Sequence, residues 1–138
     1  MPPRPPRALP AIVRVLRGEG ADLHSSPTGS VGRIYRGSGF EVVWVRKQAE
    51  AIDPAWFSQP MVDVLLVLQG KLRVEFQRPR RAKVIGPGDV LVLPPGRRCR
   101  AYRWPRTARR ATIFVAVYPL RAGARHSRRT RPPVREPS

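Results

Sequence analysis

Two rigid corners placed close together, in the stretch GPGDVLVLPPGRRC at residues 86–99, constrain this chain more than any other feature. The first corner is the turn Gly86-Pro87-Gly88-Asp89, and the second is Pro94-Pro95-Gly96. Glycine supplies backbone angles that other residues avoid, and proline fixes φ and cannot donate to a hydrogen-bonded ladder. The apolar run between the corners, residues 90–93, therefore has room for one strand of about five or six residues.

The other apolar segments also predict short strands. Residues 11–16, 40–45 and 111–118 are rich in β-branched and aromatic side chains, and residues 62–68 are nearly all apolar, as in a strand covered on both faces. Residues 72–76 alternate apolar and polar, and 31–35, 82–85 and 100–104 are further candidates. Residues 18–30 are rich in turn formers, and 48–59 predict a loop or one short turn. Because no useful length of chain has a 3.6-residue period, the sequence predicts an all-β fold, an antiparallel barrel or sandwich.

The chain is strongly basic. It has 27 Lys and Arg against 9 Asp and Glu, a net charge of +18, in 138 residues. Only Lys47, Lys71 and Lys83 are lysines, so the basic side chains are mostly arginine, which forks onto carboxylates and phosphates. Such a charge bears on solubility and anionic partners and does not determine the fold. Its simplest explanation is a solvated, acid-poor surface, and its alternative is a nucleic-acid or polyanion binder.

The ends of the chain differ in composition from its centre. Residues 1–10 are half proline and predict an extended arm, and residues 121–138, rich in Arg and Pro, predict a disordered tail. Residues 11–120 are then one domain, the barrel or sandwich predicted above. A single cysteine excludes an internal disulfide and a multi-cysteine zinc site. No apolar run has the length of a signal peptide or membrane helix, so we expect a cytoplasmic protein without a membrane partner.

Residues 41–118 resemble the cupin superfamily, a small β-barrel of jelly-roll type. The second motif of that family, G-x5-P-x-G-x2-H-x3-N, matches in its Gly/Pro skeleton at Gly88, Pro94 and Gly96. The first motif ends in E-x6-G, and Asp63 and Gly70 keep this spacing within DVLLVLQGKLRVEF. The resemblance implies a cupin barrel that is antiparallel and all-β, and a homodimer.

The chain departs from the family at the metal ligands. The resemblance implies three His and one Glu inside the barrel, because imidazole and carboxylate suit divalent first-row metals. Here the last His falls on Cys99, the Glu on Asp63, and the motif-2 Asn on Arg103. The paired His positions fall on residues without imidazole, Phe57/Gln59 or, in the other allowed spacing, Trp56/Ser58. Two good ligands rarely bind zinc tightly, so we expect no metal, no other cofactor and no catalytic set.

We therefore predict a ligand site formed by Gln59, Asp63, Cys99 and Arg103. Strand alternation places Arg103 on the same face as Cys99, where it could clamp an anionic ligand or form an ion pair with Asp63. Asp63 could equally bond turn amides, and Cys99 could be a small core residue.

The remaining candidates are aromatic residues and histidines. We expect the three tryptophans to fill the barrel or its mouth, although they and Tyr102 could stack on a ligand ring. His24 is expected in an exposed loop and His126 in the tail, so neither is expected to ligate a metal. These residues are Trp44, Trp56, Trp104, Tyr102, His24 and His126.

Three functions follow from these observations. The first is a metal-free cupin that binds a small molecule or serves a structural role, and the second is a cupin-type isomerase or oxygenase with atypical ligands. The third is unspecific nucleic-acid binding through Arg-rich surface segments, 78–83 and 97–110, and through the tail. The fold by itself does not choose among them.

Overall fold

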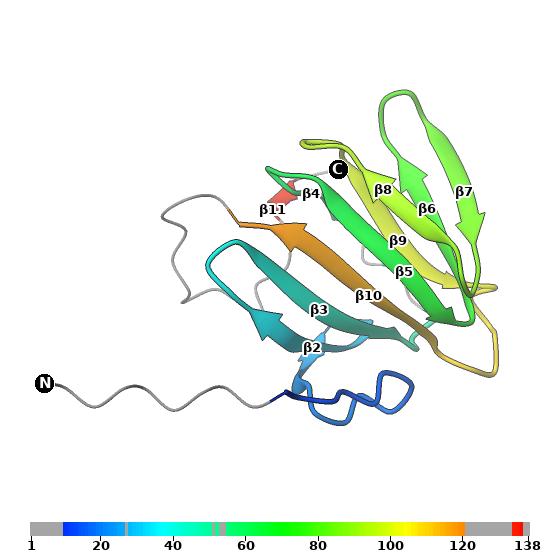
Figure 1. Cartoon of the computed structure of the whole chain (residues 1–138). Helices are drawn as coiled ribbons and strands as arrows, with labels where there is room; N and C mark the ends of the chain where they lie inside the picture. Colours follow the sequence, from blue (N-terminus) through cyan, green and yellow to red (C-terminus); the bar gives the residue numbers. More distant parts are fainter. Residues whose placement is uncertain (1–9, 27, 51, 53–54, 121–133, 137–138) are drawn as a thin grey trace, which may run out of the picture.

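The computed structural model describes residues 10–26, 28–50, 52, 55–120 and the backbone of 134–136. These residues form two antiparallel β-sheets that pack face to face, and the described part of the chain contains no helix (Figure 1). The predicted all-β class is confirmed, and the architecture is that of a jelly-roll barrel.

The first sheet has six strands in the order β1-β2-β3-β10-β5-β8. Its strands are β1 (Asp22–Ser26), β2 (Gly29–Arg36), β3 (Phe40–Lys47), β10 (Thr112–Pro119), β5 (Asp63–Gln69) and β8 (Val90–Leu93). The second sheet has five strands in the order β11-β4-β9-β6-β7. Its strands are β11 (Val134–Glu136), β4 (Trp56–Ser58), β9 (Cys99–Trp104), β6 (Lys71–Phe76) and β7 (Arg81–Ile85).

The hydrophobic core lies between the inner faces of the two sheets. Val67, Leu72 and Val74 are at most 1% exposed, and the inward positions of β3, β5, β6 and β10 follow the period of two that a strand imposes. The alternation in residues 72–76 therefore placed Leu72, Val74 and Phe76 correctly in the core. One buried set from each sheet produces a single core, as expected for a chain of this length.

The two Gly/Pro corners behave as their composition predicts. β8 occupies the four residues between them, and one glycine in each corner has positive φ, 88° at Gly88 and 71° at Gly96. The first corner is also fixed to the neighbouring strand, because the Gly88 amide donates to the Val67 carbonyl oxygen at 2.9 Å. The strand predicted at 90–93 and both turns are thus confirmed.

The start of the domain differs from the prediction. Residues 11–16 do not form a strand: Arg14 makes an isolated bridge with Glu19 around a tight turn. The reason is tertiary, because the Trp44 indole donates to the Val15 carbonyl oxygen at 2.5 Å and holds this segment against β3. The turn-rich residues 22–26 instead form β1, since β2 supplies a full set of partners for their backbone. The candidate strand at 31–35 is confirmed and is longer, Gly29–Arg36.

Two short strands occur where the sequence predicts none. Residues 56–58, predicted as loop, form β4 because Phe57 pairs with Cys99 of β9. In the predicted disordered tail, the backbone of 134–136 forms β11, which pairs with β4. The rest of that tail, His126 included, and residues 1–9 of the arm lie outside the described residues. No helix of the described chain is long and apolar enough to cross a membrane, and the cytoplasmic location stays a prediction.

Candidate functional site

A recess opens at the end of the barrel where β5 and β9 begin and β8 ends. The gap between its lining residues is about 180 Å³ when open solvent is counted, and the side chains pack closely enough to leave no enclosed space for a water molecule. Gln59, Asp63 and Cys99, three of the four predicted site residues, line it together although they lie on three different segments. The complete lining is Phe57, Ser58, Gln59, Asp63, Leu93, Pro94, Arg97 and Cys99.

The lining shows which of the paired family positions lie at the recess. Phe57, Ser58 and Gln59 line it, whereas Trp56 does not. Phe57 pairs with Cys99 across β4 and β9, so the two residues share the inner face and Trp56 is directed outward. The positions that the resemblance matched to metal ligands therefore converge in space, with different side chains.

Asp63 is the most polar buried group of the recess. Its residue is only 5% exposed, and its Oδ1 atom has no hydrogen-bond partner among the described residues. Burial raises the pKa of the Asp63 carboxyl from 3.8 to about 6, and the backbone amide of Val64 opposes part of this rise. At neutral pH the carboxylate is therefore ionised in a site that disfavours its charge. A hydrogen-bond donor placed at Oδ1 would offset part of this desolvation free energy.

Cys99 lies beside this carboxylate as a neutral thiol. Burial, followed by the negative charge of Asp63, raises the pKa of Cys99 from 9.0 to about 12, against an opposing effect of Arg97. The thiolate is the nucleophilic and metal-binding form of cysteine, so this environment suppresses both kinds of chemistry. Cys99 belongs to the core cluster of the barrel and serves as a small apolar wall of the recess.

The second Gly/Pro corner forms the rim. The Gly96 amide donates to the Gln59 carbonyl oxygen at 2.8 Å, which ties the corner to the segment after β4. The next residue, Arg97, lines the recess, donates to the Arg78 carbonyl oxygen and places its guanidinium 5.2 Å from the centre of the Phe76 ring. A rigid turn thus places the only cationic side chain of the lining at the rim.

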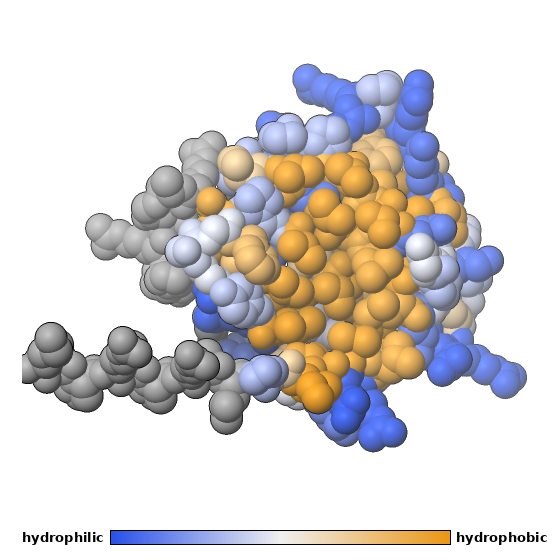
Figure 2. Space-filling model, viewed as in Figure 1, coloured by the Kyte–Doolittle hydropathy of each residue, from blue (hydrophilic) through white to orange (hydrophobic). Residues whose placement is uncertain are grey.

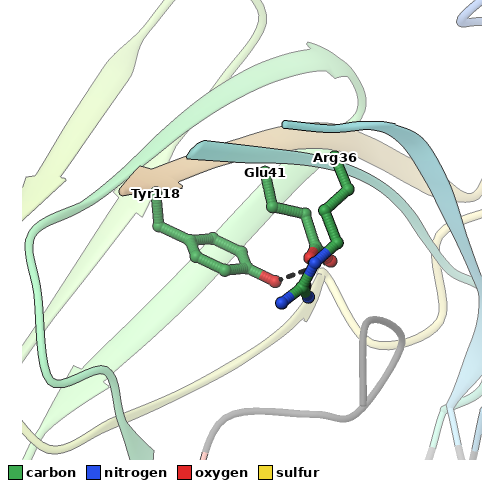
Figure 3. Close-up of polar contacts among 3 residues, drawn as sticks. All are labelled: Arg36, Glu41 and Tyr118. Carbon is green, nitrogen blue, oxygen red and sulfur yellow. Dashed lines mark hydrogen bonds and ion pairs between the residues drawn. The ribbon is translucent and has the colours of Figure 1, made fainter. Parts of the chain in front are cut away.

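Glu41, Arg36 and Tyr118 form a second polar cluster at this end of the barrel (Figure 3). Glu41 is completely buried, its Oε2 accepts from Arg36 Nη1 at 2.7 Å, and its Oε1 accepts from the Tyr118 hydroxyl at 3.0 Å. β10 and β5 pair Val117 with Val64, so the next residue along, Tyr118, lies beside Asp63. Burial, then Glu41 and Asp63, raise the pKa of the Tyr118 phenol, which keeps it a hydrogen-bond donor.

The sequence reasoning did not single out this cluster. One signal was present, because Glu41 is in phase with Val43 and Val45, which belong to the core. A carboxylate in phase with core residues requires a partner of opposite charge or a hydrogen-bond donor. The identity of those partners depends on the pairing of β3 with β2 and β10, which the sequence does not state.

Arg103, the fourth predicted site residue, does not line the recess. It is on the inner face of β9, as alternation predicts, and is 7% exposed. Its guanidinium donates to the carbonyl oxygens of Ala108, at 2.8 Å, and of Arg106. It therefore closes the loop 105–110, four residues along β9 from Cys99, and the ion pair with Asp63 considered above is not formed.

The tryptophans also differ from the prediction, because none of them fills the barrel. Trp44 alternates with Val43 and Val45 and is covered by the segment before β1. Trp56 and Trp104 lie on the outer face of the second sheet, where the guanidiniums of Arg100 and Arg73 stand 4.5 and 4.7 Å from their ring centres. Tyr102 donates to Glu75 at 2.6 Å on the same outer face. His24 is half-exposed on β1, 3.6 Å from Asp22.

The donor set of the recess does not fit the metal that the fold family implies. It offers one carboxylate, one thiol whose pKa is raised to about 12, and one amide. Among the described residues no group of three or more His, Cys, Asp and Glu is arranged to hold an ion. Metal-binding cysteine must lose its proton, so this set is a poor one for zinc or other divalent ions.

Comparisons with known proteins place the fold. No protein-family model matches the sequence, and no curated protein matches it either. Among solved structures, an RmlC-like cupin from Shewanella frigidimarina is 17% identical with a TM-score of 0.61, covering 77% of this chain and 90% of its own. The polyketide cyclase RemF from Streptomyces resistomycificus is 15% identical with a TM-score of 0.58, covering 73% of this chain and 69% of its own.

A mutant of oxalate decarboxylase OxdC from Bacillus subtilis is also similar, at 14% identity and a TM-score of 0.59. The match covers 71% of this chain but only 27% of the decarboxylase chain. These likenesses concern the fold, which is shared by proteins of different named activities.

Proposed function

Because the chain has the cupin fold, in agreement with its Gly/Pro motif, we propose that it is a cupin domain that binds a small polar molecule at the recess without a catalytic metal. The side chains that line the recess move apart to admit this molecule. The observation that carries this proposal is Asp63, whose Oδ1 is buried at the recess without a hydrogen-bond partner among the described residues. A buried carboxylate oxygen in this state is costly, and a ligand N–H or O–H group would satisfy it.

The other lining residues define the ligand further. Arg97 has five N–H donors and uses one of them on Arg78, so it can also bind an anionic group. Phe57, Leu93 and Pro94 add apolar walls. The chemistry that suits both ends of the recess is a small carboxylic acid that carries a hydroxyl or an ammonium group. Its carboxylate would bind Arg97, and its donor would bind Asp63.

The test uses glycolate and glycine as probes, with acetate as the analogue that lacks the donor. Ligand-observed NMR on the full chain is expected to show binding of glycolate or glycine in preference to acetate. Asp63→Asn and Arg97→Ala are each expected to weaken this binding by roughly 10-fold or more, because each removes a charge-assisted hydrogen bond. Arg98→Ala is the matched control, because Arg98 neighbours Arg97 but does not line the recess.

The proposal fails if the wild-type chain binds none of the probes, or if binding persists unchanged in both recess variants. A loss of binding in Arg98→Ala equal to that in Arg97→Ala would also overturn it, since it would indicate a general effect of positive charge. Metal content is measured on the same samples. Stoichiometric Fe, Mn, Ni or Zn that Asp63→Ala with Cys99→Ala abolishes would favour the metalloenzyme alternative instead.

A second candidate is the binding of polyanions such as nucleic acid. The β6–β7 hairpin favours it, because Arg78, Arg80, Arg81 and Lys83 are all exposed there, and Figure 2 shows hydrophilic side chains at this end of the molecule. If this surface makes six to ten phosphate contacts, raising the salt concentration from low to physiological should lower its affinity for a DNA duplex by ~10³–10⁵-fold. Weak salt dependence, or binding unchanged after Arg80→Ala with Arg81→Ala and deletion of residues 121–138, would exclude it.

A further inference from the structure

We propose that the outer face of the five-stranded sheet binds single-stranded nucleic acid. The inference rests on the second candidate function above, polyanion binding, and assigns it a surface and a kind of partner that the hairpin arginines do not define. The surface, called here the cationic stripe, is a line of basic side chains backed by two indole rings. It consists of Lys71, Arg73, Arg100 and Arg80 with Trp104 and Trp56.

Strand register places the cations of the stripe in successive rows. On β6, Lys71 and Arg73 occupy alternate positions, opposite Trp104 and Tyr102 of β9. Arg100 lies in the next row, two residues from Tyr102 on β9. Alternate residues on one face of a strand recur about every 6.6–6.8 Å, so the three charges form a line along the sheet. A single-stranded nucleic acid has a flexible backbone with a phosphate at every nucleotide, so it can follow such a line.

Two tryptophan rings hold the arginines of the stripe in place. The Arg73 guanidinium lies 4.7 Å from the centre of the Trp104 ring, and the Arg100 guanidinium lies 4.5 Å from the centre of the Trp56 ring. Arg80, in the β6–β7 hairpin, lies 6.0 Å from the same Trp56 ring and extends the line beyond Arg100. Because a guanidinium held over a ring has already lost part of its rotamer freedom, binding a phosphate costs it less entropy.

The stripe has little acidic charge to offset its cations. The strands β4, β6, β7 and β9 contain a single acidic residue, Glu75. Its carboxylate accepts from Arg100 Nε at 2.7 Å and from the Tyr102 hydroxyl at 2.6 Å. Arg100 donates through Nε there, and a guanidinium has four further N–H groups. The surface is therefore complementary to a polyanion.

The rings favour a single strand over a duplex as the partner. Trp104 is partly exposed on the outer face of β9, beside the Arg73 guanidinium. Bases stack on aromatic rings and on guanidinium planes, and an unpaired strand presents its base faces to them. In a duplex the bases stack on one another, so a duplex would contact the cations alone, and an acidic protein would do the same. Trp56 is 3% exposed and supports Arg100 without itself being a stacking surface.

Exposed basic side chains continue the stripe at both of its ends. They are Arg106, Arg109 and Arg110 in the loop after β9, and Arg78 and Arg81 at the β6–β7 hairpin. A strand that follows the stripe therefore meets cations along the whole length of the sheet.

The test is fluorescence anisotropy of the full chain, purified at high salt, with labelled strands of about 12 nucleotides, a length within the site size of such surfaces. The probes are oligothymidylate, oligouridylate and a DNA duplex of the same length, with polyglutamate as a competitor. Both single strands should bind more tightly than the duplex at physiological salt, by roughly 5-fold or more, because only they stack on the rings. Binding of either single strand supports the proposal, and the tighter of the two identifies DNA or RNA as the source.

Variants test whether the site is the stripe. Trp104→Leu should weaken single-strand binding by roughly 5-fold or more, as expected for one stacked base, and Trp104→Phe should retain most of the binding. Arg73→Gln should also weaken it and reduce the slope of log affinity against log salt by about 0.7, the contribution of one phosphate contact. Arg14→Gln is the matched control, because it removes the same charge from an exposed residue in the segment that Trp44 holds against the other sheet. Circular dichroism verifies that all variants are folded.

Equal affinity for the duplex and the single strands would overturn the proposal and leave polyanion binding in place. Displacement by polyglutamate as effective as that by unlabelled oligothymidylate would do the same. Binding that is lost in Arg80→Ala with Arg81→Ala, but unchanged in Arg73→Gln and Trp104→Leu, would assign it to the hairpin alone. A loss in Arg14→Gln equal to that in Arg73→Gln would show that only net charge matters. Binding to none of the probes would overturn this inference and the polyanion candidate together.

Discussion

Asp63 and Glu41 are two buried carboxylates at the same end of the barrel, and their surroundings are opposite. Glu41 accepts hydrogen bonds from Arg36 and Tyr118 and is fully buried by them and by β3. Asp63 has an oxygen without a partner among the described residues, and its pKa is raised to about 6. Hydrogen bonds and an ion pair offset the desolvation of a buried carboxylate, whereas an unpartnered carboxylate oxygen lowers the free energy of unfolding until a ligand donates to it.

The raised pKa of Asp63 predicts a dependence of stability on pH. The folded-state pKa, about 6, exceeds the reference value of 3.8, so the contribution of this group is most favourable below pH 4 and is lost as pH rises through 6. Asp63→Asn removes this loss and should raise the free energy of unfolding at pH 7 by up to about 3 kcal/mol, with the gain shrinking toward pH 4. Urea unfolding of both proteins from pH 4 to 8 measures it, with exposed Asp22→Asn as control. A constant difference across this range would contradict the assignment.

The Arg36–Glu41 pair predicts strong energetic coupling. Arg36→Met leaves the Glu41 carboxylate in a buried site without its cation and should cost about 3 kcal/mol of unfolding free energy. Arg36→Met with Glu41→Leu removes both charges and should recover much of that loss, while Tyr118→Phe should cost only about 1 kcal/mol. Denaturant unfolding of the single and double variants gives the coupling energy. Additive losses would show that the pair does not act as a unit.

At the scale of elements, tight turns determine which strands become neighbours. Gly70 separates β5 in one sheet from β6 in the other, so the chain changes sheets at this single residue. The corner 86–89 fixes β8 beside β5, and the corner 94–96 carries the chain from β8 into β9. The recess is the result, because its lining residues lie at the ends of these short strands.

Substitution at Gly70 tests this function of the turn. Gly70 has φ +70°, and a Cβ there would lie 2.9 Å from Thr112 Oγ1, so Gly70→Ala should destabilise the fold by about 1–3 kcal/mol. Gly39→Ala is the matched control, because its φ is not positive and a Cβ would meet nothing within 4 Å. It should leave stability unchanged or raise it by about 0.4–1 kcal/mol. Thermal unfolding compares the two, and equal effects would contradict the role given to Gly70.

At the scale of the whole molecule, charge is distributed unevenly over the surface. The described ion pairs are few, and Arg17–Glu19 and Asp22–His24 among them are largely exposed. Because the chain has 27 basic residues and only 9 acidic ones, ion pairs can offset only a minority of its positive charges. Figure 2 shows a hydrophobic area with hydrophilic side chains at its borders on the side of the molecule that is drawn. Self-repulsion of like charges lowers the stability of the compact state.

This distribution predicts that salt stabilises the chain. Between ~0.01 M and ~0.1 M NaCl the screening length falls from ~30 Å to ~10 Å, which weakens the repulsion among the arginines. The melting temperature at fixed protein concentration should therefore rise by several degrees, as a gain of about 1 kcal/mol would produce in a domain of this size. Differential scanning calorimetry measures the change. A melting temperature that falls with salt would mean that the ion pairs outweigh the repulsion.

Local patterns in the sequence were sufficient for the class of fold and for most strands. The glycines at 88 and 96 adopt backbone angles that other residues avoid, as expected of the two corners, and the alternation of residues 72–76 identified core positions. The spacing of Asp63, Gly70, Gly88 and Pro94 led to the cupin fold, and three of four predicted site residues line one recess. These features depend on backbone geometry and on a period of two, which are properties of short segments.

Tertiary structure alone decided which side chains meet. Residues 11–16 look like a strand, but Trp44 of β3 binds their backbone and holds them in a turn. Arg103 faces inward as alternation requires, yet four residues of β9 separate it from Cys99, and the loop 105–110 takes its guanidinium. Glu41 and Tyr118 are distant in sequence and adjacent because β3 pairs with β10. Where a strand was predicted correctly, the alternation in its sequence determined which side chains share a face, and the register between strands determined their partners.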